Sequence, residues 1–540
     1  MLDYHLAHAL ALTGLTLVAS LVLLALEDGA VAWVDCWFTA TSAVTVTGLG
    51  VVDTAALRTS SKAIVLSLIC LGGQVSFAVV PLCIRRVVAW RQRLKGSADA
   101  PAREAREARA LRVLMALYLV YGAAWTALGW LAISVHCASN ARAREVLAER
   151  GLSPEWFGLF TAVSAFNNAG FSLVDSLVPF QDDAVMLMVV AALIAAGNTL
   201  LPVLCRAALS LAQRTLLRGD EQDAVELLLS RPRLFTTHMF EGGQTLWLLF
   251  IWLATTGFQF LVYTFAPYNV PEEQLSWSKA LQMFFTTIST RTAGFNVIDL
   301  DSLSAGVMVM QLMLMYLASY PFIVAVKSTR EGALEQEQEQ EQEQEQDAQH
   351  VERQLQDQQG QQEQRQPRQR NSRREQFSGP AREARKTLAS DLWWLAISAF
   401  LVAVTNPWLD IATLFRLNWE VVSAFGNVGT SLPLPDHVAS FSSGMNDWGK
   451  LVIIAVMIAG RHRGMPHSLD AAITPIGLYT EREIAQRVAR LARRRTSRVL
   501  NATERTYRRP LPQPRRTQLS KLFPQVDPDL EPVAAPLERV

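Results

Sequence analysis

The chain has 540 residues, of which 50% are hydrophobic, and its mean hydropathy is +0.17. Together with long unbroken apolar runs, these values exclude an ordinary water-soluble domain and predict an integral membrane protein. The formal net charge of +1 says little by itself, because the basic residues are segregated into separate connections along the chain. No nucleic-acid partner is expected from this charge balance.

Eight apolar segments approach or exceed the roughly 20 residues that a helix needs to cross a bilayer core of about 30 Å. Only helices and closed barrels satisfy the backbone inside a membrane, and long apolar runs favour helices. We therefore expect an all-α membrane protein with eight spanning helices. The segments are Leu10–Leu26, Ala63–Leu82, Leu111–Val135, Ala184–Leu204, Leu246–Phe265, Val307–Val326, Leu392–Ala403 and Leu451–Ala459 with its flanks.

A shorter, semi-apolar segment separates the two spans of each successive pair. About a dozen residues are too few to cross a membrane. Irregular backbone is tolerated at membrane depth only where it is buried in protein or lines a wet cavity, so we interpret these segments as re-entrant pore helices. The four segments are Trp33–Thr45, Glu155–Asn167, Trp277–Thr290 and Asn418–Gly426.

A short glycine motif closes each pore segment, and we call the four motifs the first to fourth glycine loops. In three copies a Ser-Ala pair starts six residues before the glycine, at Ser42, Ser164 and Ser423. The third copy has Ile288-Ser289 instead, so its pore helix is expected to pack differently. The candidate residues are Thr45, Val46, Thr47 and Gly48 in the first loop, Asn167, Asn168, Ala169 and Gly170 in the second, Thr292, Ala293 and Gly294 in the third, and Asn427, Val428 and Gly429 in the fourth.

The four glycines lie 122, 124 and 135 positions apart, a near-constant period with one insertion. This period predicts four membrane–pore–membrane repeats. The insertion is low in complexity, with alternating Glu and Gln from Glu335 to Gln346, and is expected to be a solvated linker. The predicted organisation is repeat 1 at 1–95, repeat 2 with cytoplasmic connections at 96–235, repeat 3 at 236–328, the disordered linker at 329–388, repeat 4 at 389–478 and a basic tail at 479–540.

Basic residues gather in alternate connections, which sets the expected orientation. The four groups are Arg85–Arg112, Arg206–Arg233, Lys327–Lys386 and Arg482–Arg516. The positive-inside rule places all of them, and both termini, on the cytoplasmic side. The glycine loops then lie towards the outside, and the basic tail lies against the inner leaflet of the lipid bilayer.

Four similar glycine turns in one membrane chain can form the four walls of one ring. Rings of backbone carbonyls replace the hydration shell of a potassium ion, and glycine tolerates the backbone conformations that this requires. The C-terminal end of a short pore helix adds a partial negative charge. Asp35, Glu155 and Glu420 lie near the starts of three pore segments, where they stabilise the positive helix end and leave a vestibule acidic; helix capping alone is the simpler interpretation.

Two stretches resemble the second and third filter loops of the Trk/Ktr/HKT cation transporters. They are Ser-Ala-Phe-Asn-Asn-Ala-Gly-Phe-Ser at 164–172 and Ser-Thr-Arg-Thr-Ala-Gly-Phe-Asn at 289–296. The segments 197–202, 315–321, 391–394 and 460–466 are similar to the fungal Trk branch of that family. Matches fall in all four units and cover most of the chain from Met1 to about Pro475.

The resemblance implies four repeats around one pore, usually in a homodimer, and potassium uptake at the plasma membrane. Sodium-selective plant relatives replace the first filter glycine by serine, so Gly48 implies potassium. The resemblance also implies that Arg461, in the last span, lies below the filter as an electrostatic barrier or gate. Snorkelling of Arg461 to the inner surface together with Arg463 is the alternative. Lys450 is expected to be interfacial, and Arg291 to brace its loop through backbone carbonyls.

We therefore expect a transporter for K⁺ driven by the membrane potential, with K⁺ at the filter carbonyls and no cofactor. No nucleotide-binding Gly-x-x-x-x-Gly-Lys-[Ser/Thr] motif is present. The same fold passing Na⁺, or both ions, is the nearest alternative. A membrane-embedded enzyme is not favoured, since no His-Glu-x-x-His or Gly-x-Ser-x-Gly motif occurs. A scaffold without transport would be expected to have lost filter glycines.

Overall fold

The structure is a computed structural model that describes residues 4–94, 101–215, 218–230, 232, 235–236, 238–265, 277–317, 378–411, 413–434 and 439–463. All of them lie in one compact unit, Met1–Pro475. Over these residues the chain forms helices and no β-strand. The predicted tail at 479–540 and the linker from 329 to 377 lie outside the described residues. Helical structure already begins at Ser378, before the predicted linker boundary at 388.

The helices follow the predicted order of long and short elements. Around the first two glycine loops they are α1 (Tyr4–Leu26), α2 (Trp33–Val44), α3 (Thr59–Gly72), α4 (Gln74–Leu94), α5 (Pro101–Ser139), α6 (Ala141–Glu149), α7 (Pro154–Phe166), η1 (Val178–Phe180), α8 (Ala184–Gly197), α9 (Leu201–Thr215) and α10 (Asp220–Ser230). Around the last two they are α11 (Gly242–Phe265), α12 (Trp277–Ser289), η3 (Leu300–Ser302), α13 (Ala305–Leu317), α15 (Ser378–Thr405), α16 (Leu414–Gly426), η4 (Phe441–Gly444) and α17 (Asp447–His462).

Side-chain caps fix the starts of several helices. Ser153 Oγ accepts a hydrogen bond from Trp156 N at the start of α7, where Pro154 takes the first helical position. Asp183 Oδ1 accepts from Met186 N at the start of α8, and Asn446 Oδ1 accepts from Gly449 N at the start of α17. Each cap satisfies an amide that the helix itself leaves unpaired.

Three helices are long and apolar enough to cross a membrane: α1 from Leu6, α5 from Ala108, and α11. Two further predicted spans are not single straight helices. The pair α3 and α4 is bent by 58°, and α8 and α9 by 80°. With each bent pair counted as one span, the described residues contain up to five. The sixth, seventh and eighth predicted spans fall on shorter helical stretches, in α13, the second half of α15 and the 16-residue α17.

The breaks occur where these helices meet the ends of the short helices α2 and α7. A Cβ built on Gly73 would collide with the Asn167 side chain, and one on Gly197 with the carbonyl oxygen of Phe166. The backbones therefore approach each other more closely than any side chain would allow. The predicted spans Ala63–Leu82 and Ala184–Leu204 are therefore each divided into two helices at these points.

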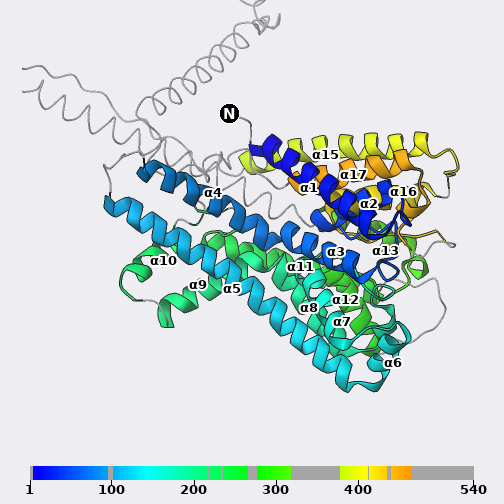
Figure 1. Ribbon diagram of the computed structural model, residues 1–540, viewed down its shortest axis with the longest axis horizontal. Coiled ribbons are helices and arrows are strands. Elements are labelled where there is room, and N and C mark those ends of the chain that lie inside the picture. The colour runs from blue at the N-terminus through cyan, green and yellow to red at the C-terminus, as the bar shows by residue number, and fades with distance from the viewer. Residues whose placement is uncertain are drawn as a thin grey trace, which may run out of the picture. The chain divides into compact units, whose positions relative to one another are not determined.

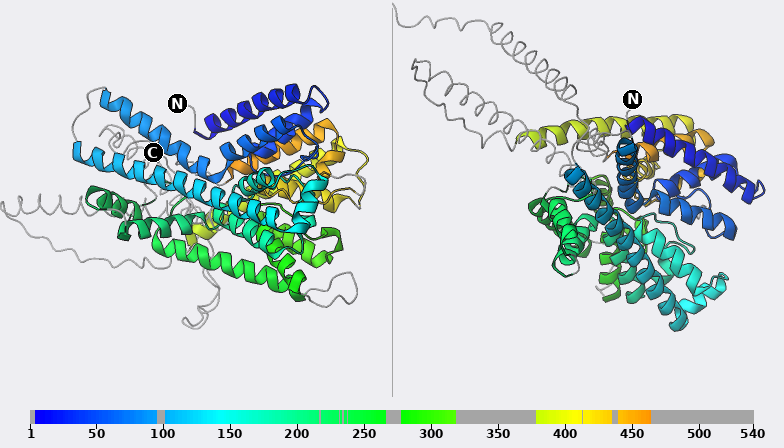
Figure 2. Two further views of the ribbon diagram at one scale, coloured as in Figure 1. Left: turned by 60° about the horizontal axis from the view of Figure 1, so that its bottom comes forward. Right: turned by 60° about the vertical axis from the view of Figure 1, so that its left-hand side comes forward.

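The described helices pack in sequence order and also across the chain. Helix α2 lies between α1, α3 and α17, so the first and last repeats are neighbours (Figure 1). The long helix α5 runs beside α4 and also packs on α7 and α8 (Figure 2). The first and last described helices, α1 and α17, thus both pack on the short helix α2.

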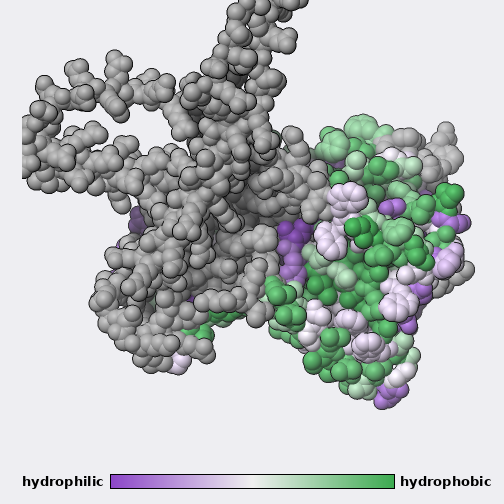
Figure 3. All heavy atoms as spheres, turned by 90° about the horizontal axis from the view of Figure 1, so that it is seen from above, coloured by the Kyte–Doolittle hydropathy of each residue, from purple (hydrophilic) through white to green (hydrophobic). Residues whose placement is uncertain are grey.

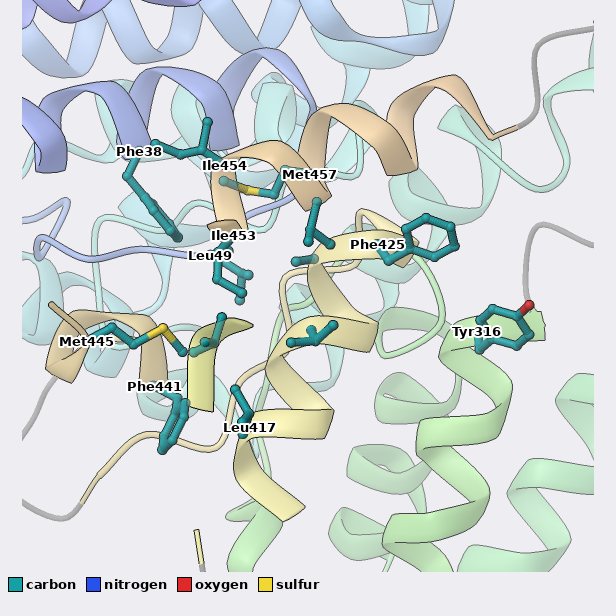
Figure 4. Close-up of a cluster of buried hydrophobic side chains, with 14 residues drawn as sticks. Phe38, Leu49, Tyr316, Leu417, Phe425, Phe441, Met445, Ile453, Ile454 and Met457 are labelled. Atoms are coloured by element: carbon teal, nitrogen blue, oxygen red, sulfur yellow. The ribbon is translucent and has the colours of Figure 1, made fainter. Parts of the chain in front are cut away.

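One buried cluster joins the first and fourth repeats. Phe38 of α2 and Leu49, just after the first glycine, lie with Phe425 of α16 and with Ile453 and Met457 of α17 (Figure 4). Burial of such side chains contributes roughly 1.5–3 kcal/mol each. The cluster holds two of the four glycine loops in a fixed position.

Large apolar side chains also cover parts of the exterior, as the green areas of the described surface in Figure 3 show. Leu119, Leu128 and Leu131 of α5 and Leu246 and Phe250 of α11 are all exposed. An apolar exterior of this kind is typical of a helix that faces lipid rather than water.

Candidate functional site

The four short helices α2, α7, α12 and α16 each end where a glycine loop begins. The first three match the predicted pore segments to within one residue at each end, and α16 begins four residues earlier than predicted, at Leu414. Their last turns are almost entirely buried. The short helical segments were thus predicted correctly from the sequence.

All four loop glycines have a left-handed backbone conformation. Their φ angles are 91° at Gly48, 70° at Gly170, 73° at Gly294 and 89° at Gly429. Residues with a side chain rarely adopt such angles, because the Cβ atom collides with the neighbouring peptide. The choice of glycine at these positions is therefore explained by the backbone, as the motif indicated.

The glycines also follow one another in a closed cycle. A Cβ on Gly170 would lie 2.6 Å from the carbonyl oxygen of Ala293, in the third loop. In the same way a Cβ on Gly48 would meet Ala169 O, one on Gly294 would meet Val428 O, and one on Gly429 would meet Thr47 O. Each glycine thus faces the carbonyl oxygen just before the glycine of the next loop, and the fourth loop returns to the first. The structure brings all four predicted motifs together around one point.

Two serines of the short helices bind the backbone of the loops that follow them. Ser42 Oγ accepts a hydrogen bond from Gly48 N, and Ser423 Oγ accepts one from Gly429 N, both at 3.0 Å. Backbone bonds repeat in three loops, from Thr47 N to Ser42 O (2.9 Å), Ala169 N to Ser164 O (2.8 Å) and Val428 N to Ser423 O (3.0 Å). The hydroxyl of Ser164 is buried and has no hydrogen-bond partner among the described residues.

The residue two positions before the glycine is left-handed in the same three loops. It is Val46 in the first, Asn168 in the second and Asn427 in the fourth, with φ of 49°, 58° and 51°. Asn168 Nδ2 donates to Ile194 O of α8 (3.0 Å), and Asn427 Nδ2 donates to Met457 O of α17 (3.0 Å). Asparagine tolerates this conformation better than other residues with side chains, and its amide then ties the loop to the following helix.

The third loop is built differently, as the displaced serine predicted. Ser289 O accepts from both Ala293 N (2.8 Å) and Gly294 N (3.1 Å), and Ser289 Oγ donates to Phe295 O (2.7 Å). Thr292 is absent from the residues with positive φ. Arg291 instead holds this loop: it donates to Thr287 O and to the hydroxyls of Thr255 and Thr256 on α11, at 3.2, 2.7 and 2.6 Å. The predicted brace is thus confirmed, with two hydroxyls in addition to a carbonyl.

Further glycines allow the following helices to touch the ends of the short helices. A Cβ on Gly72 would collide with Val44 O, and one on Gly460 with Phe425 O. Gly197 has the same relation to Phe166. No role was expected for Gly72 from the sequence; the signal that could have found it is a glycine late in the apolar segment after the first, second and fourth loops, at Gly72, Gly197 and Gly460.

Arg461 lies at the bend between α3 and α4. Its Nη2 atom donates to the carbonyl oxygen of Gly72, the last residue of α3, and its guanidinium lies 5.0 Å from the centre of the Phe77 ring. A helix C-terminus carries a partial negative charge that a cation stabilises. The side chain therefore points into the bundle.

Arg463 does not extend to an aqueous surface, so the proposed snorkelling of this residue is wrong. Its Nε atom pairs with Asp391 Oδ2 at 2.9 Å, and the two side chains are 4% and 11% exposed. The guanidinium also lies 4.3 Å from the Tyr316 ring centre and 4.9 Å from that of Phe425. A buried arginine needs such a partner, because an unpaired charge in a low-dielectric interior is very costly.

Two other charged residues have buried partners. Lys450 is 8% exposed, and its Nζ atom lies 2.6 Å from Asp35 Oδ1 in the first turn of α2; its position at the membrane interface stays a prediction. Glu420 is not at the start of α16 but in its middle and is fully buried. Its carboxylate accepts from Ser431 Oγ (2.6 Å), Ser442 N (2.9 Å) and Ser442 Oγ (2.5 Å).

Of the three acidic residues, only Asp35 and Glu155 lie in a first helical turn, and Glu155 is exposed. Glu420 instead joins the chain after the fourth glycine to the segment before α17. That segment also reaches the first loop, where Ser440 N and Oγ donate to Gly50 O at 2.8 and 2.7 Å. The first and fourth loops are therefore linked outside the cycle of glycines as well.

Comparison with known proteins gives a consistent result. The TrkH family, described as a cation transport protein, matches residues 12–481. A low-affinity potassium transport protein of Saccharomyces cerevisiae is 30% identical over 377 residues, which cover 66% of this chain and 42% of the relative. A high-affinity potassium transport protein of the same yeast is 29% identical over 397 residues, with 66% and 32% covered.

The chain thus spans less than half the length of these two yeast relatives. Among solved structures, the potassium transporter TrkH from Vibrio parahaemolyticus is similar with a TM-score of 0.46 and 17% sequence identity. That similarity covers 85% of this chain and 83% of the bacterial chain.

Proposed function

Since the chain belongs to the TrkH family of cation transport proteins, we propose that it carries potassium ions across the plasma membrane through one pore lined by the four glycine loops. The cycle of glycines is the observation that carries this proposal. Each left-handed glycine faces the carbonyl oxygen that precedes the glycine of the next loop. Carbonyls arranged in a ring can replace the water around K⁺ as it enters the pore.

Within this proposal each ion meets oxygens from four repeats. The oxygens are those of Thr47, Ala169, Ala293 and Val428, with neighbouring carbonyls of the same loops above and below. The short helices α2, α7, α12 and α16 direct their C-terminal ends towards the loops they precede, and the partial negative charge of those ends favours a cation. No cofactor is required for this selection.

The proposed architecture has four membrane–pore–membrane repeats, with eight spans and four re-entrant helices in the lipid bilayer. The bent pairs α3–α4 and α8–α9 would each serve as one span. The loops would face outward, with both termini in the cytoplasm. As in the family pattern implied by the motifs, two copies would form a homodimer. The named relatives are transport proteins and not enzymes.

The membrane potential would drive uptake. Moving one elementary charge through 100 mV releases about 2.3 kcal/mol, which is sufficient to concentrate a monovalent cation inside the cell. Arg461 would set an electrostatic barrier below the ring, since it places a positive charge between α17 and the bend of α3 and α4.

Gly48 supports K⁺ over Na⁺ as the transported ion. A side chain at this position would press on Ala169 O and approach Gly170 Cα to 3.1 Å. A serine here would therefore reshape the ring at the contact between the first two loops. We expect a narrower or distorted ring to favour Na⁺, the smaller ion.

The test is growth of a yeast strain that lacks its own potassium uptake, on low K⁺, with the full chain at the plasma membrane. Wild type should restore growth, and Gly48→Ser should lower the K⁺-over-Na⁺ preference by about tenfold, the effect of roughly 1.4 kcal/mol. Preference is measured as Rb⁺ uptake at increasing Na⁺.

Gly306→Ala is the matched control, because a Cβ on Gly306 in α13 would meet no atom within 4 Å. Surface expression of each variant is measured in parallel. A well-expressed wild type that fails to restore growth would contradict potassium transport. Wild type that takes up Na⁺ as readily as K⁺ would favour the sodium or mixed alternative.

A further inference from the structure

A chain of side-chain hydrogen bonds crosses the contact between the fourth and first glycine loops. Asn427 Nδ2 lies 2.9 Å from Thr47 Oγ1, and Thr47 Oγ1 lies 2.7 Å from Thr45 Oγ1. Thr45 Oγ1 lies 2.7 Å from the carbonyl oxygen of Thr41 in α2. The three side chains are short, and Thr45 and Thr47 are fully buried.

The contacts determine the direction of every bond in this chain. Asn427 Nδ2 also lies 3.0 Å from Met457 O, and a carbonyl can only accept, so the amide nitrogen is the atom that faces both partners. Thr45 has one hydroxyl proton, which goes to Thr41 O. Thr47 must therefore donate to Thr45 and accept from Asn427.

The hydrogen bonds run one way, from Asn427 of the fourth loop through Thr47 and Thr45 into α2, and the same amide also donates to Met457 O of α17. Bonds aligned in one direction polarise one another and strengthen in a buried site. The single hydroxyl proton of Thr47 is thereby donated to Thr45 Oγ1. The first loop is left to offer its backbone carbonyl, not its hydroxyl, to the centre of the ring.

This cross-link acts at one contact of the cycle. The carbonyl of Thr47 is also the one that faces Gly429, so the same residue is held by its side chain and meets the fourth loop through its backbone. Asn168, the equivalent residue in the second loop, donates to Ala165 O, Phe166 O and Ile194 O, which all belong to its own repeat. The two asparagines are therefore alike in conformation but differ in what they hold.

We propose that the Asn427 amide and the Thr47 hydroxyl form a specificity-determining cross-link that sets the position of the Thr47 carbonyl. Both are positioning residues in this role, and the proposal rests on the potassium-transport function given above. The amide also connects the ring to α17 at Met457, one helical turn before Arg461. A shift of the fourth loop would thereby be transmitted to the helix that carries this arginine.

The experiment is a double-mutant cycle in the full chain. Asn427→Gly removes the amide but retains the left-handed backbone, which glycine adopts without strain. Thr47→Val removes the hydroxyl at nearly constant volume. We expect each to lower the K⁺-over-Na⁺ preference of Rb⁺ uptake by about threefold or more, and the double variant to be no worse than the more severe single variant.

Two matched variants separate the cross-link from general damage. Asn168→Gly makes the same change in the second loop, and its effect should multiply with that of Thr47→Val. Thr47→Ser retains the hydroxyl and should retain the coupling to Asn427. Independent effects of Asn427→Gly and Thr47→Val would overturn the proposal, and so would reduced expression with an unchanged ion preference.

A second measurement separates this proposal from the transport function. The same cycle is applied to the thermal unfolding temperature of the purified protein in detergent, where coupling between the two side chains does not require transport. Coupling in unfolding without any cation uptake by wild type would contradict the transport function and with it the specificity role. Uptake by wild type without coupling in either measurement would overturn the cross-link alone.

Discussion

The third and fourth glycine loops place a left-handed glycine in the same cycle by different means. In the fourth loop Ser423 and Asn427 hold the chain to its own short helix and to α17, which follows it. In the third loop no left-handed residue precedes the glycine, and Arg291 holds the chain to α11, which comes before it. Yet Gly294 and Gly429 both have a positive φ and both face a carbonyl of the next loop.

The difference between the two loops indicates that the motif is constrained in its backbone rather than in its supporting side chains. The position of the glycine and of the carbonyl before it is common to all four loops, whereas the side chains behind them vary. A ring of carbonyls restricts the backbone that lines it, because the oxygens must point at one ion. The supporting contacts only have to be rigid. The Arg291 guanidinium, bonded to two threonine hydroxyls, supplies this rigidity in the third loop, as Asn427 and Ser423 do in the fourth.

The largest expected effect is the same in both loops. Alanine at Gly294 or Gly429 must adopt a positive φ and press on Val428 O or Thr47 O. Strain of this kind costs about 1–3 kcal/mol, so we expect the rate of Rb⁺ uptake to fall by about tenfold or more for either variant. Normal uptake by one of the two would show that its loop does not line the pathway.

The next effect should be confined to the third loop. Arg291→Lys keeps the charge but cannot reach Thr255 and Thr256 together, since a lysine has no planar fork of donors. We expect the KM for K⁺ uptake to rise by about tenfold, in line with hydrogen bonds to a charged group worth roughly 1.5–3 kcal/mol. Rb⁺ uptake over a range of concentrations measures this.

The control for Arg291→Lys removes its partners instead. Thr255→Val and Thr256→Val together should give a similar rise in KM, and adding Arg291→Lys should change little more. If the three substitutions act independently, Arg291 does not work through these hydroxyls, and the contrast between the third and fourth loops would need another basis.

Much of this contrast could be read from local sequence. The short helices, the left-handed glycines and the irregular third loop all follow from residues within a few positions of each other. Ser289 stands one residue later than its counterparts, and this shift alone indicates a different hydrogen-bond pattern. Backbone conformation near a helix end depends on such neighbours.

The features that could not be predicted depend on partners far away in the chain. Lys450 and Asp35 are 415 positions apart, and Arg463 and Asp391 are 72 apart. The bends at Gly73 and after Gly197 arise because α2 and α7 end against these helices. A sequence pattern shows that a charge or a glycine is present, but only packing shows what it meets.

The smallest effects should distinguish the serines that the motif makes look alike. Ser42→Ala and Ser423→Ala each remove the acceptor of a glycine N–H, whereas Ser164→Ala removes a hydroxyl with no hydrogen-bond partner among the described residues. A net hydrogen bond contributes about 1 kcal/mol, so the first two should raise the KM for K⁺ by about two- to fivefold and Ser164→Ala by less. Equal effects at all three positions would mean that these serines act by filling space, and the distinction drawn between loops by their side-chain bonds would then rest on Arg291 and Asn427 alone.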